Sequence, residues 1–287
     1  KQLLIIGGGP IGCELAQAFR RLGSQVTILT RDPKVLPKED RDLAELVLKN
    51  FESEGIQMQT EVQVERIEKK NSEQQIYFRK DGVEQQIKAD HILLATGRKP
   101  GTSGLGLKEV GVELNPDGTV KVDPFLRSSI PNIYACGDVA GPFQFTHVAG
   151  HQAWYATVNA LFSPFKKFAV DYRVVPWCTF TDPELARVGL SEEDAQAQNI
   201  AYDKTTFDLS GLDRAIAERN NYGMIKVLTK PGKDQILGAA ICGPHAGDLL
   251  SEFVLAMKHG IGLNKILGTI HAYPTYADAN KLTAGVW

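Results

Sequence analysis

The chain has 287 residues, 43% of them hydrophobic, which allows about two domains of roughly 150 residues each. Its 32 basic and 34 acidic side chains give a net charge of −2, which argues against nucleic-acid and membrane-surface partners. No apolar run approaches the roughly 20 residues that span a bilayer, so we expect a cytoplasmic protein with no membrane span.

Residues 3–6 (LLII) predict a buried strand that leads directly into the glycine turn GGGPIG at 7–12 and then into a helix. This order of strand, turn and helix binds the pyrophosphate of a dinucleotide. Gly7 allows the tight turn, Gly9 lets the backbone approach the phosphates, and Gly12 lets helix and strand pack closely. Such turns also occur for steric reasons alone, but the preceding buried strand favours nucleotide binding.

The N-terminal part alternates between strands and helices, as a parallel sheet with crossover helices does. After it, β-prone segments and a hairpin turn at 81–82 predict a small antiparallel insertion. The expected elements are strand 3–6, helix 11–22, strand 26–29, helix 43–51, strand 56–58, insertion 62–87 and strand 91–95.

The rest of the chain begins with a Gly/Pro-rich stretch at 100–118 and a second apolar strand at 132–135, followed by linker composition at 163–167. Beyond residue 172 the pattern predicts a separate α+β domain. Its expected elements are strands at 174–180, 186–190, 222–228 and 236–242, a short helix capped by Ser191 with Asp194, and a helix at 248–259.

Four motifs occur in order: GGGPIG with Glu14, ATGRKP at 95–100, YACGDVAG at 134–141, and HAYPT at 271–275. Together they resemble the pyridine nucleotide-disulfide oxidoreductases, the family of lipoamide dehydrogenase, glutathione reductase and mercuric reductase. The resemblance covers essentially the whole chain. It implies an α/β fold with a Rossmann-like NAD(P)-binding domain at 1–98 that carries the antiparallel insertion, the C-terminal part of an FAD-binding domain at 99–170, and an α+β dimerisation domain at 171–287.

The resemblance also implies an FAD-dependent oxidoreductase that passes hydride from NAD(P)H to FAD and electrons on to an acceptor. Asp138 would hydrogen-bond the ribityl chain of FAD, and Glu14 matches an acidic residue near the flavin beside the nicotinamide. The helix that begins at Thr146 would point its positive end at the flavin. The implied cofactor-binding residues are Gly7, Gly9, Pro10, Ile11, Gly12, Thr30, Arg31, Gly97, Gly137, Asp138, Thr146 and His147.

Two features depart from the family. Relatives carry an N-terminal FAD half with its own glycine fingerprint and a CxxxxC redox disulfide, and neither is present in this chain, which begins without Met directly at the expected nucleotide-binding strand. The sequence therefore resembles the C-terminal portion of such an enzyme, without a signal peptide, and we expect it to bind FAD poorly alone. Its four cysteines (Cys13, Cys136, Cys178 and Cys242) form no paired spacing and predict buried thiols in a reducing compartment.

The second departure concerns the terminal motif. Thiol-disulfide reductases of this group place a general base, His, before the Pro and a Glu four residues after it; here these positions hold Tyr273 and Asp278. A tyrosine with a pKa near ~10 is a poor base but a good hydrogen-bond or proton donor. We therefore predict against lipoamide or glutathione reduction. His271 would replace the base only if the loop turned differently; otherwise it is structural or faces solvent.

In relatives this loop reaches across a two-fold dimer, so Tyr273 and Asp278 would act as catalytic residues in the partner's site, with Glu14 beside the flavin. We expect a homodimer that passes electrons to a small-molecule or thiol/disulfide acceptor. An NAD(P)H oxidase or quinone diaphorase on the same scaffold, and a catalytically incomplete nucleotide-binding fragment that dimerises, are the alternatives.

The end of the second strand bears on the choice of coenzyme. An acidic residue there accepts bonds from the ribose of NAD, whereas a cation accommodates the 2′-phosphate of NADP. The chain has Thr30, then Arg31, with Lys34 close by, which favours NADP. NAD stays open, because Asp32 can also serve the ribose and Arg31 can be an ordinary surface cation.

His147 and His151 lie four residues apart, but no third ligand is near, so no metal site is predicted; they line the flavin end or face solvent. Arg98 is expected to close the NAD(P) domain through a hydrogen bond or an ion pair.

Overall fold

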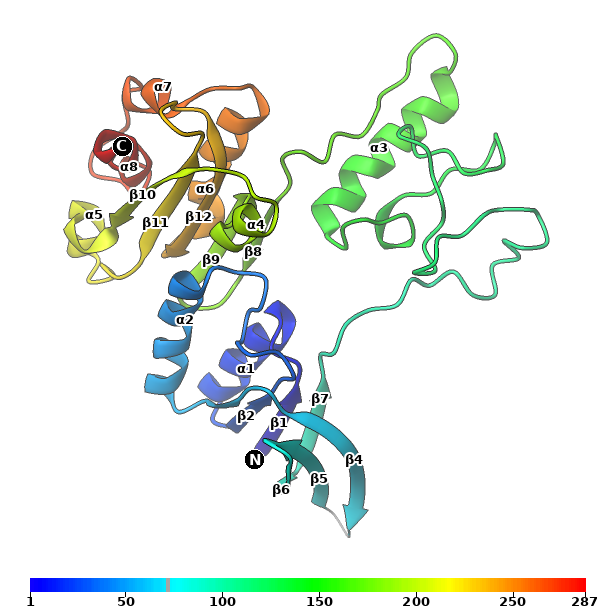
Figure 1. Cartoon of the computed structure of the whole chain (residues 1–287), viewed down its shortest axis with the longest axis vertical. Helices are drawn as coiled ribbons and strands as arrows, with labels where there is room; N and C mark the ends of the chain where they lie inside the picture. The colour runs from blue at the N-terminus through cyan, green and yellow to red at the C-terminus, as the bar shows by residue number, and fades with distance from the viewer. Residues whose placement is uncertain (71–72) are drawn as a thin grey trace. The chain divides into compact units, whose positions relative to one another are not determined.

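The computed structural model describes residues 1–70 and 73–287 (Figure 1). Its contacts group the chain into two compact units: residues 1–96 together with 176–287, and residues 97–175. The expected NAD(P) and dimerisation domains thus lie in the first unit, except for residues 97–98 and 171–175. All of the expected partial FAD domain lies in the second. The three-domain boundaries at 98 and 170 stay a prediction.

The first unit begins with a four-stranded parallel sheet in the order β3-β2-β1-β7. Helices α1 and α2 connect its strands, and the expected alternation of strand and helix is confirmed. The elements are β1 (Gln2–Ile6), α1 (Pro10–Arg21), β2 (Gln25–Leu29), α2 (Arg41–Glu54), β3 (Gln57–Gln59) and β7 (His91–Leu94).

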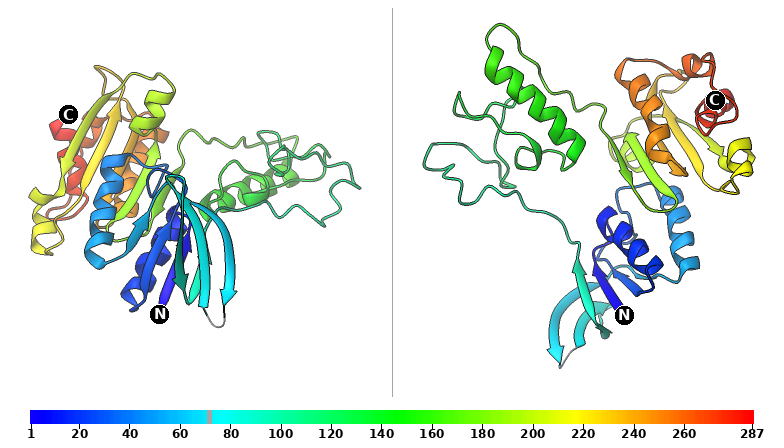
Figure 2. Two further views of the ribbon diagram at one scale, coloured as in Figure 1. Left: turned by 60° about the horizontal axis from the view of Figure 1, so that its bottom comes forward. Right: turned by 180° about the vertical axis from the view of Figure 1, so that it is seen from behind.

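The insertion is a three-stranded antiparallel sheet in the order β4-β5-β6, with β4 (Gln63–Lys70), β5 (Glu73–Lys80) and β6 (Val83–Ala89). Asp81 and Gly82 both have positive φ, 51° and 78°, as a two-residue type I′ hairpin turn requires. The expected hairpin is therefore confirmed. Figure 2 shows the insertion extending beside β7 and β1.

Different elements pack on the two faces of the parallel sheet: helices on one face and the antiparallel insertion on the other. Successive side chains of a strand point to opposite faces, so Ile5 and Ile28 pack against α1 and α2, in a core that contains Phe51. Leu4 and Leu29 pack against the insertion. The helix-side core continues into the C-terminal part of the same unit, where Leu185, Ala240 and Cys242 belong to it.

The C-terminal part of this unit is a five-stranded antiparallel sheet in the order β10-β11-β12-β9-β8. The capping box predicted at the start of α4 is present, because the amide of Asp194 donates to Ser191 Oγ at 2.9 Å. The elements are β8 (Pro176–Thr179), β9 (Glu184–Gly189), α4 (Glu192–Ala197), β10 (Asp203–Asp208), η2 (Leu209–Gly211), α5 (Asp213–Ala217), β11 (Met224–Thr229), β12 (Ile236–Gly243), α6 (Ala246–Lys258), α7 (Leu263–Leu267) and α8 (Asp278–Val286).

The second unit contains one long helix, α3 (Thr146–Phe162), and a 3₁₀ turn, η1 (Gly137–Val139), surrounded by loops. The strand predicted at 132–135 is wrong: this segment forms only one isolated bridge, between Tyr134 and Arg127. The backbone amide of Ala135 instead bonds the carbonyl of Leu126 at 3.0 Å. The segment is apolar but at most partly buried, and a strand also needs a partner ladder, which no other described segment of this unit supplies.

Buried side-chain amides hold the second unit together. Asn159 on α3 donates to the carbonyls of Phe125 and Phe168 at 3.0 and 2.9 Å, and its Oδ1 accepts from the amide of Phe168 at 2.7 Å. Farther up the helix, Gln152 Oε1 accepts from the amide of Gly137 at 2.6 Å. These bonds replace the strand ladders that would otherwise satisfy the backbone of the loops.

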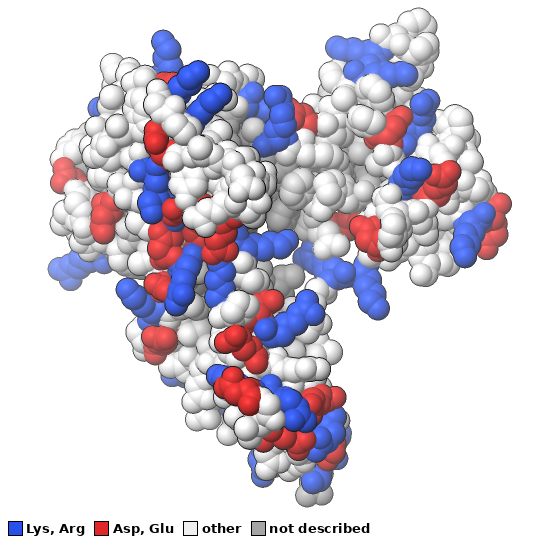
Figure 3. Space-filling model, in the orientation of Figure 1, with Lys and Arg blue, Asp and Glu red and all other residues white. Residues whose placement is uncertain are grey.

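The length and hydropathy of the helices and the distribution of surface charge bear on membrane and nucleic-acid partners. Within the described residues, no helix is long and apolar enough to cross a bilayer. On the face shown in Figure 3, Lys and Arg side chains alternate with Asp and Glu side chains, so no large basic field forms there.

We expect Asn159→Ala to loosen the second unit, because it leaves three partly buried backbone groups of Phe125 and Phe168 without their partner on α3. The expected cost is about 1–3 kcal/mol in the free energy of opening α3. Hydrogen exchange of the α3 amides measures it. Thr157→Ala is the matched control, since Thr157 is exposed on the same helix and bonds only back to Ala153. Equal exchange in both variants would contradict the assignment.

Candidate functional site

The glycine turn between β1 and α1 is fixed by close backbone approaches. Gly7 has φ 121°, and its amide donates to the carbonyl of Leu29 at 2.8 Å. A Cβ at Gly7 would lie 2.3 Å from the carbonyl oxygen of Ala95, and one at Gly12 would lie 2.1 Å from the carbonyl oxygen of Gly7. Only glycine fits either position, so the turn holds β1, β7 and α1 together.

Gly9 differs from these two glycines. It is the N-cap of α1, makes no side-chain cap bond, and has no atom within 4 Å of the place a Cβ would occupy. Pro10 follows at the first helical position, and the amides of Ile11 and Gly12 in the first turn have no intrahelical acceptor. Open space at the positive end of a helix fits a pyrophosphate.

At the carboxyl end of β2, Thr30 is buried, and its hydroxyl lies 3.3 Å from the amide of Asp32, which donates to it. Arg31 is exposed. Lys34 is engaged elsewhere: its Nζ bonds Glu193 and donates to the carbonyl of Glu39 at 2.6 Å. Arg31 and Lys34 were the two cations that the sequence placed near a 2′-phosphate. Of these, Arg31 is exposed, whereas Lys34 is held by other partners.

Glu14 lies in the second turn of helix α1. Its Oε1 accepts a hydrogen bond from the amide of Phe180 at 2.9 Å. The side chain thus joins the helix of the glycine turn to the end of β8. Its expected position near the flavin stays a prediction. Sequence reasoning missed the bond to Phe180, because no local pattern relates residues so far apart.

The second unit carries the residues expected to hold FAD. Gly137 is buried with φ 76°, and half-exposed Asp138 pairs with Arg98 at 3.6 Å. Thr146 starts α3, and exposed His147 stacks on Phe145 with ring centroids 5.2 Å apart. A carboxylate and the positive start of a helix in one unit fit the polar parts of a flavin cofactor.

Three further residues of the second unit, Arg98, Gly97 and His151, were singled out in the sequence analysis. Arg98 does form the expected polar contacts, but both partners, Gln144 at 2.9 Å and Asp138, lie in the second unit, so its expected role in closing the NAD(P) domain is corrected. Gly97 has φ 126° with open space around it. His151 is exposed and stacks on Tyr155 at 4.3 Å.

The terminal loop presents Tyr273 with 71% of its surface exposed. Its hydroxyl donates to Asp213 Oδ2 at 2.7 Å, and this hydrogen bond, together with the carboxylate's charge, raises the pKa of Tyr273. Asp278 is half-buried at the start of α8 and adds a smaller effect of the same direction through its charge. The sequence offered Asp278 as the nearby carboxylate, whereas the structure brings Asp213 from α5 to the hydroxyl.

His271 is held within the chain. Its Nε2 lies 2.9 Å from Glu252 Oε1 and its Nδ1 lies 3.0 Å from the carbonyl oxygen of Thr269. The other oxygen of Glu252 accepts from Asn280 Nδ2 at 2.9 Å. Glu252 on α6 therefore ties both ends of the loop that carries Tyr273. This geometry favours the structural role for His271.

The cysteines correct one expectation. Cys13 and Cys242 are buried, but Cys136 and Cys178 are only partly buried. Burial raises the pKa of Cys13 and Cys242 well above the usual range, and burial followed by the charge of Glu184 raises that of Cys178 to about 12. These three groups are therefore thiols rather than thiolates at neutral pH.

Comparison with known families decides the assignment. The family model for pyridine nucleotide-disulphide oxidoreductases matches residues 1–153, and the model for their dimerisation domain matches residues 175–284. The chain belongs to this family. The expected family and fold class are thus confirmed, and the second match places a dimerisation domain where the sequence predicted one.

Individual relatives agree. The chain is 38% identical to a dihydrolipoyl dehydrogenase of Thermus scotoductus over 97% of this chain and 60% of the relative. It is 35% identical to a mercuric reductase of Lysinibacillus sphaericus over 99% of this chain and 52% of the relative. The chain therefore spans about 60% or less of the length of these curated relatives.

Solved structures show the same fold. The HOCl-induced flavoprotein disulfide reductase RclA from Escherichia coli superposes with a TM-score of 0.89 at 28% identity, over 99% of this chain and 64% of that one. LpdA from Mycobacterium tuberculosis superposes with a TM-score of 0.90 at 27% identity, over 99% of this chain and 61% of that one.

The glycine turn generates a paired prediction. Gly9→Ala places its Cβ in open space, so we expect unchanged stability, but about tenfold weaker binding of a pyridine nucleotide, equivalent to ~1.4 kcal/mol. Gly12→Ala forces its Cβ against the carbonyl of Gly7, so we expect about 1–3 kcal/mol lower stability. Urea denaturation and titration calorimetry measure the two quantities. A stable Gly12→Ala, or a Gly9→Ala that binds normally, would contradict this division of roles.

Proposed function

We propose that the chain is the coenzyme-binding and dimerising part of a flavin-dependent oxidoreductase, in which hydride passes from NAD(P)H to FAD and electrons leave to an acceptor. The observation that carries the proposal is the open space beside Gly9 at the N-terminus of α1, in a turn whose other two glycines, Gly7 and Gly12, are closely packed. The pyrophosphate of the coenzyme would accept hydrogen bonds from the free amides there.

The chain's own residues divide the remaining work. FAD, when bound, supplies the two-electron redox chemistry that no protein side chain provides. Asp138 would accept a hydrogen bond from the ribityl chain, and Thr146 and His147 would lie at the positive start of α3. Glu14 would stay oriented by its bond to the amide of Phe180.

NADPH is the proposed coenzyme. Exposed Arg31 follows Thr30 at the carboxyl end of β2, where the ribose 2′-phosphate would lie. Lys34 contributes little there, because Glu193 and the carbonyl of Glu39 hold its ammonium group. The preference therefore depends mainly on one guanidinium, which suits a phosphate.

A small-molecule acceptor such as a quinone is favoured over lipoamide or glutathione. A dithiol needs a general base, and Tyr273 is a poor one because its bond to Asp213 raises its pKa. A protonated phenol is instead suited to donate its hydrogen bond to the acceptor in place of Asp213. An oxidase reaction with dioxygen on the same scaffold is the second candidate.

Dimerisation is proposed for the C-terminal part of the first unit. Several apolar side chains near α6 and the terminal loop are exposed, with Ile270 96% accessible and Leu255 also outward. A second copy would cover them and would receive Tyr273 in its own site. Placement in the cytoplasm stays a prediction.

The first experiment titrates the purified chain with NADPH, NADH and FAD by calorimetry, with a visible spectrum of the FAD mixture. We expect both pyridine nucleotides to bind, NADPH more tightly, because the glycine turn and Arg31 are present. FAD should bind weakly, and any bound flavin should bleach on anaerobic addition of NADPH. Failure of both pyridine nucleotides to bind would overturn the proposed function.

Tyr273→Phe tests the acceptor side in the flavin-loaded protein. We expect electron transfer to a quinone to slow by about 100-fold because the donor hydroxyl is lost, while reduction of the flavin by NADPH is unchanged. Stopped-flow absorbance separates the two half-reactions. Tyr77→Phe is the control, since the hydroxyl of Tyr77 bonds only Gln75 in the insertion. Equal slowing of both half-reactions would remove Tyr273 from the acceptor site.

A further inference from the structure

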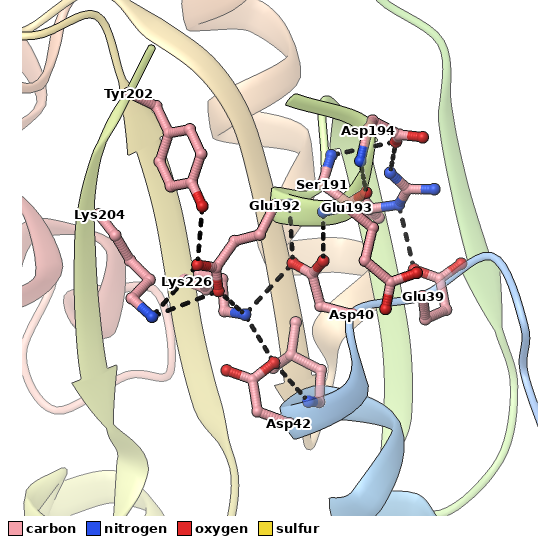
Figure 4. A network of polar contacts seen from close by, with 12 residues as sticks. Glu39, Asp40, Asp42, Ser191, Glu192, Glu193, Asp194, Tyr202, Lys204 and Lys226 are labelled. Atoms are coloured by element: carbon pink, nitrogen blue, oxygen red, sulfur yellow. Dashed lines mark hydrogen bonds and ion pairs between the residues drawn. The ribbon is translucent and has the colours of Figure 1, made fainter. Parts of the chain in front are cut away.

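A buried lysine meets three carboxylates where the two parts of the first unit join (Figure 4). Lys226 on β11 is 1% exposed. Its Nζ lies 2.6 Å from Asp42 Oδ1, 3.2 Å from Asp40 Oδ2 and 2.6 Å from Glu192 Oε1. Burial by itself lowers the pKa of Lys226, but the bonds to Asp42 and Glu192 outweigh it and raise the pKa. The lysine is therefore a fixed cation.

A buried arginine, Arg187, binds the residues that precede Asp40, namely Lys38 and Glu39. Arg187 on β9 is 3% exposed; its Nε lies 3.1 Å from Glu39 Oε2, and a terminal nitrogen donates to the carbonyl of Lys38 at 2.8 Å. Its guanidinium lies 4.4 Å from the ring centre of Trp177, whose Nε1 donates to Glu39 Oε1 at 2.7 Å. Asp194 pairs with the same guanidinium.

Both cations hold one stretch of chain, which we call the 30–42 segment and which runs from the carboxyl end of β2 into the first turn of α2. The backbone amides of Glu192 and Glu193 add to this hold by donating to the carboxylate of Asp40 at 3.2 and 3.3 Å. Every residue from Lys38 to Asp42 except Arg41 thus bonds the C-terminal part of the unit through a side chain or carbonyl.

The opposite side of the 30–42 segment borders the glycine turn. The amide of Leu36 donates to the carbonyl of Gly8 at 2.7 Å, and a Cβ at Gly8 would lie 3.0 Å from Cβ of Thr30. The segment therefore has two contacts at once: the proposed coenzyme site on one side, and the buried cations of the antiparallel sheet on the other.

The three carboxylates around Lys226 could by themselves surround a metal ion, since their oxygens lie within 4.8 Å of one another. The ammonium group already occupies that place, with each carboxylate in contact. Buried ion pairs add little net stability because desolvation offsets their attraction. What they do supply is a defined geometry for the chain they hold.

We propose that Arg187 and Lys226 are positioning residues for the coenzyme: they fix the 30–42 segment so that Thr30 and Arg31 meet the ribose and its 2′-phosphate. Neither cation touches the coenzyme. The inference depends on the proposed function, since it concerns the same coenzyme site. It assigns to the dimerisation domain a role in nucleotide selection as well as in assembly.

Lys226→Met and Arg187→Met test the proposal, with Lys204→Met as the matched control. Lys204 pairs with Glu192 at 3.2 Å, in the same network, but makes no bond to the 30–42 segment. Calorimetry with NADP⁺ and with 2′,5′-ADP should show about tenfold weaker binding by the first two variants and unchanged binding by the control. Circular dichroism confirms that each variant is folded.

Hydrogen exchange of the unaltered chain tests the proposal without depending on whether a variant folds. Coupling between two sites is reciprocal, so NADP⁺ should slow exchange of the amides of Glu192 and Glu193, which bond Asp40, and leave that of Ser210, which bonds Asp208, unchanged. Unchanged affinity in a folded Lys226→Met and Arg187→Met overturns the inference. If neither variant folds, unchanged exchange at Glu192 and Glu193 overturns it. Absence of NADP⁺ binding by the unaltered chain instead overturns the proposed function.

Discussion

The close approach of α1 to the glycine turn is the constraint on which the parallel-sheet part and its proposed coenzyme site depend. Because Gly12 has no side chain, the helix can begin directly against the carbonyl of Gly7, and the same turn brings Ala95 at the end of β7 into contact. The first turn of the helix is thereby left open beside Gly9. One turn therefore has two positions, Gly7 and Gly12, where only glycine fits, and a third, Gly9, that is open to a ligand.

The five-stranded antiparallel sheet packs against the parallel-sheet part and helps to hold it in place. Its buried cations hold the 30–42 segment, and Leu185 and Ala240 share a core with the helices of the parallel sheet. The terminal loop is held by Glu252 on α6 and Asp213 on α5. The 30–42 segment and the terminal loop thus both depend on contacts with the C-terminal part of the first unit.

The sequence predicted what is encoded locally. Apolar periodicity located α1, α2 and the parallel strands, and the glycine motif located the candidate coenzyme site. The edge strand β10 was missed because only Thr205 of its six residues is buried, so it lacks alternation. The strand at 132–135 was wrongly predicted because apolar character does not supply a partner strand; the segment is at most partly buried and forms one isolated bridge. Asp213 beside Tyr273, and Lys226 beside Asp40, lie too far apart in sequence for any pattern to reveal.

The first unit is discontinuous, since residues 97–175 separate its two parts. On a ribosome, the parallel sheet is therefore complete long before the strands that bury Arg187 and Lys226 have been made. Until then Glu39 and Asp40, buried in the finished chain, remain hydrated. Closing so long a loop costs little more entropy than closing one half its length, but it delays completion of the unit until the C-terminal strands have been made. A nascent chain that lacks these strands would therefore expose the carboxylates of Glu39 and Asp40 to water.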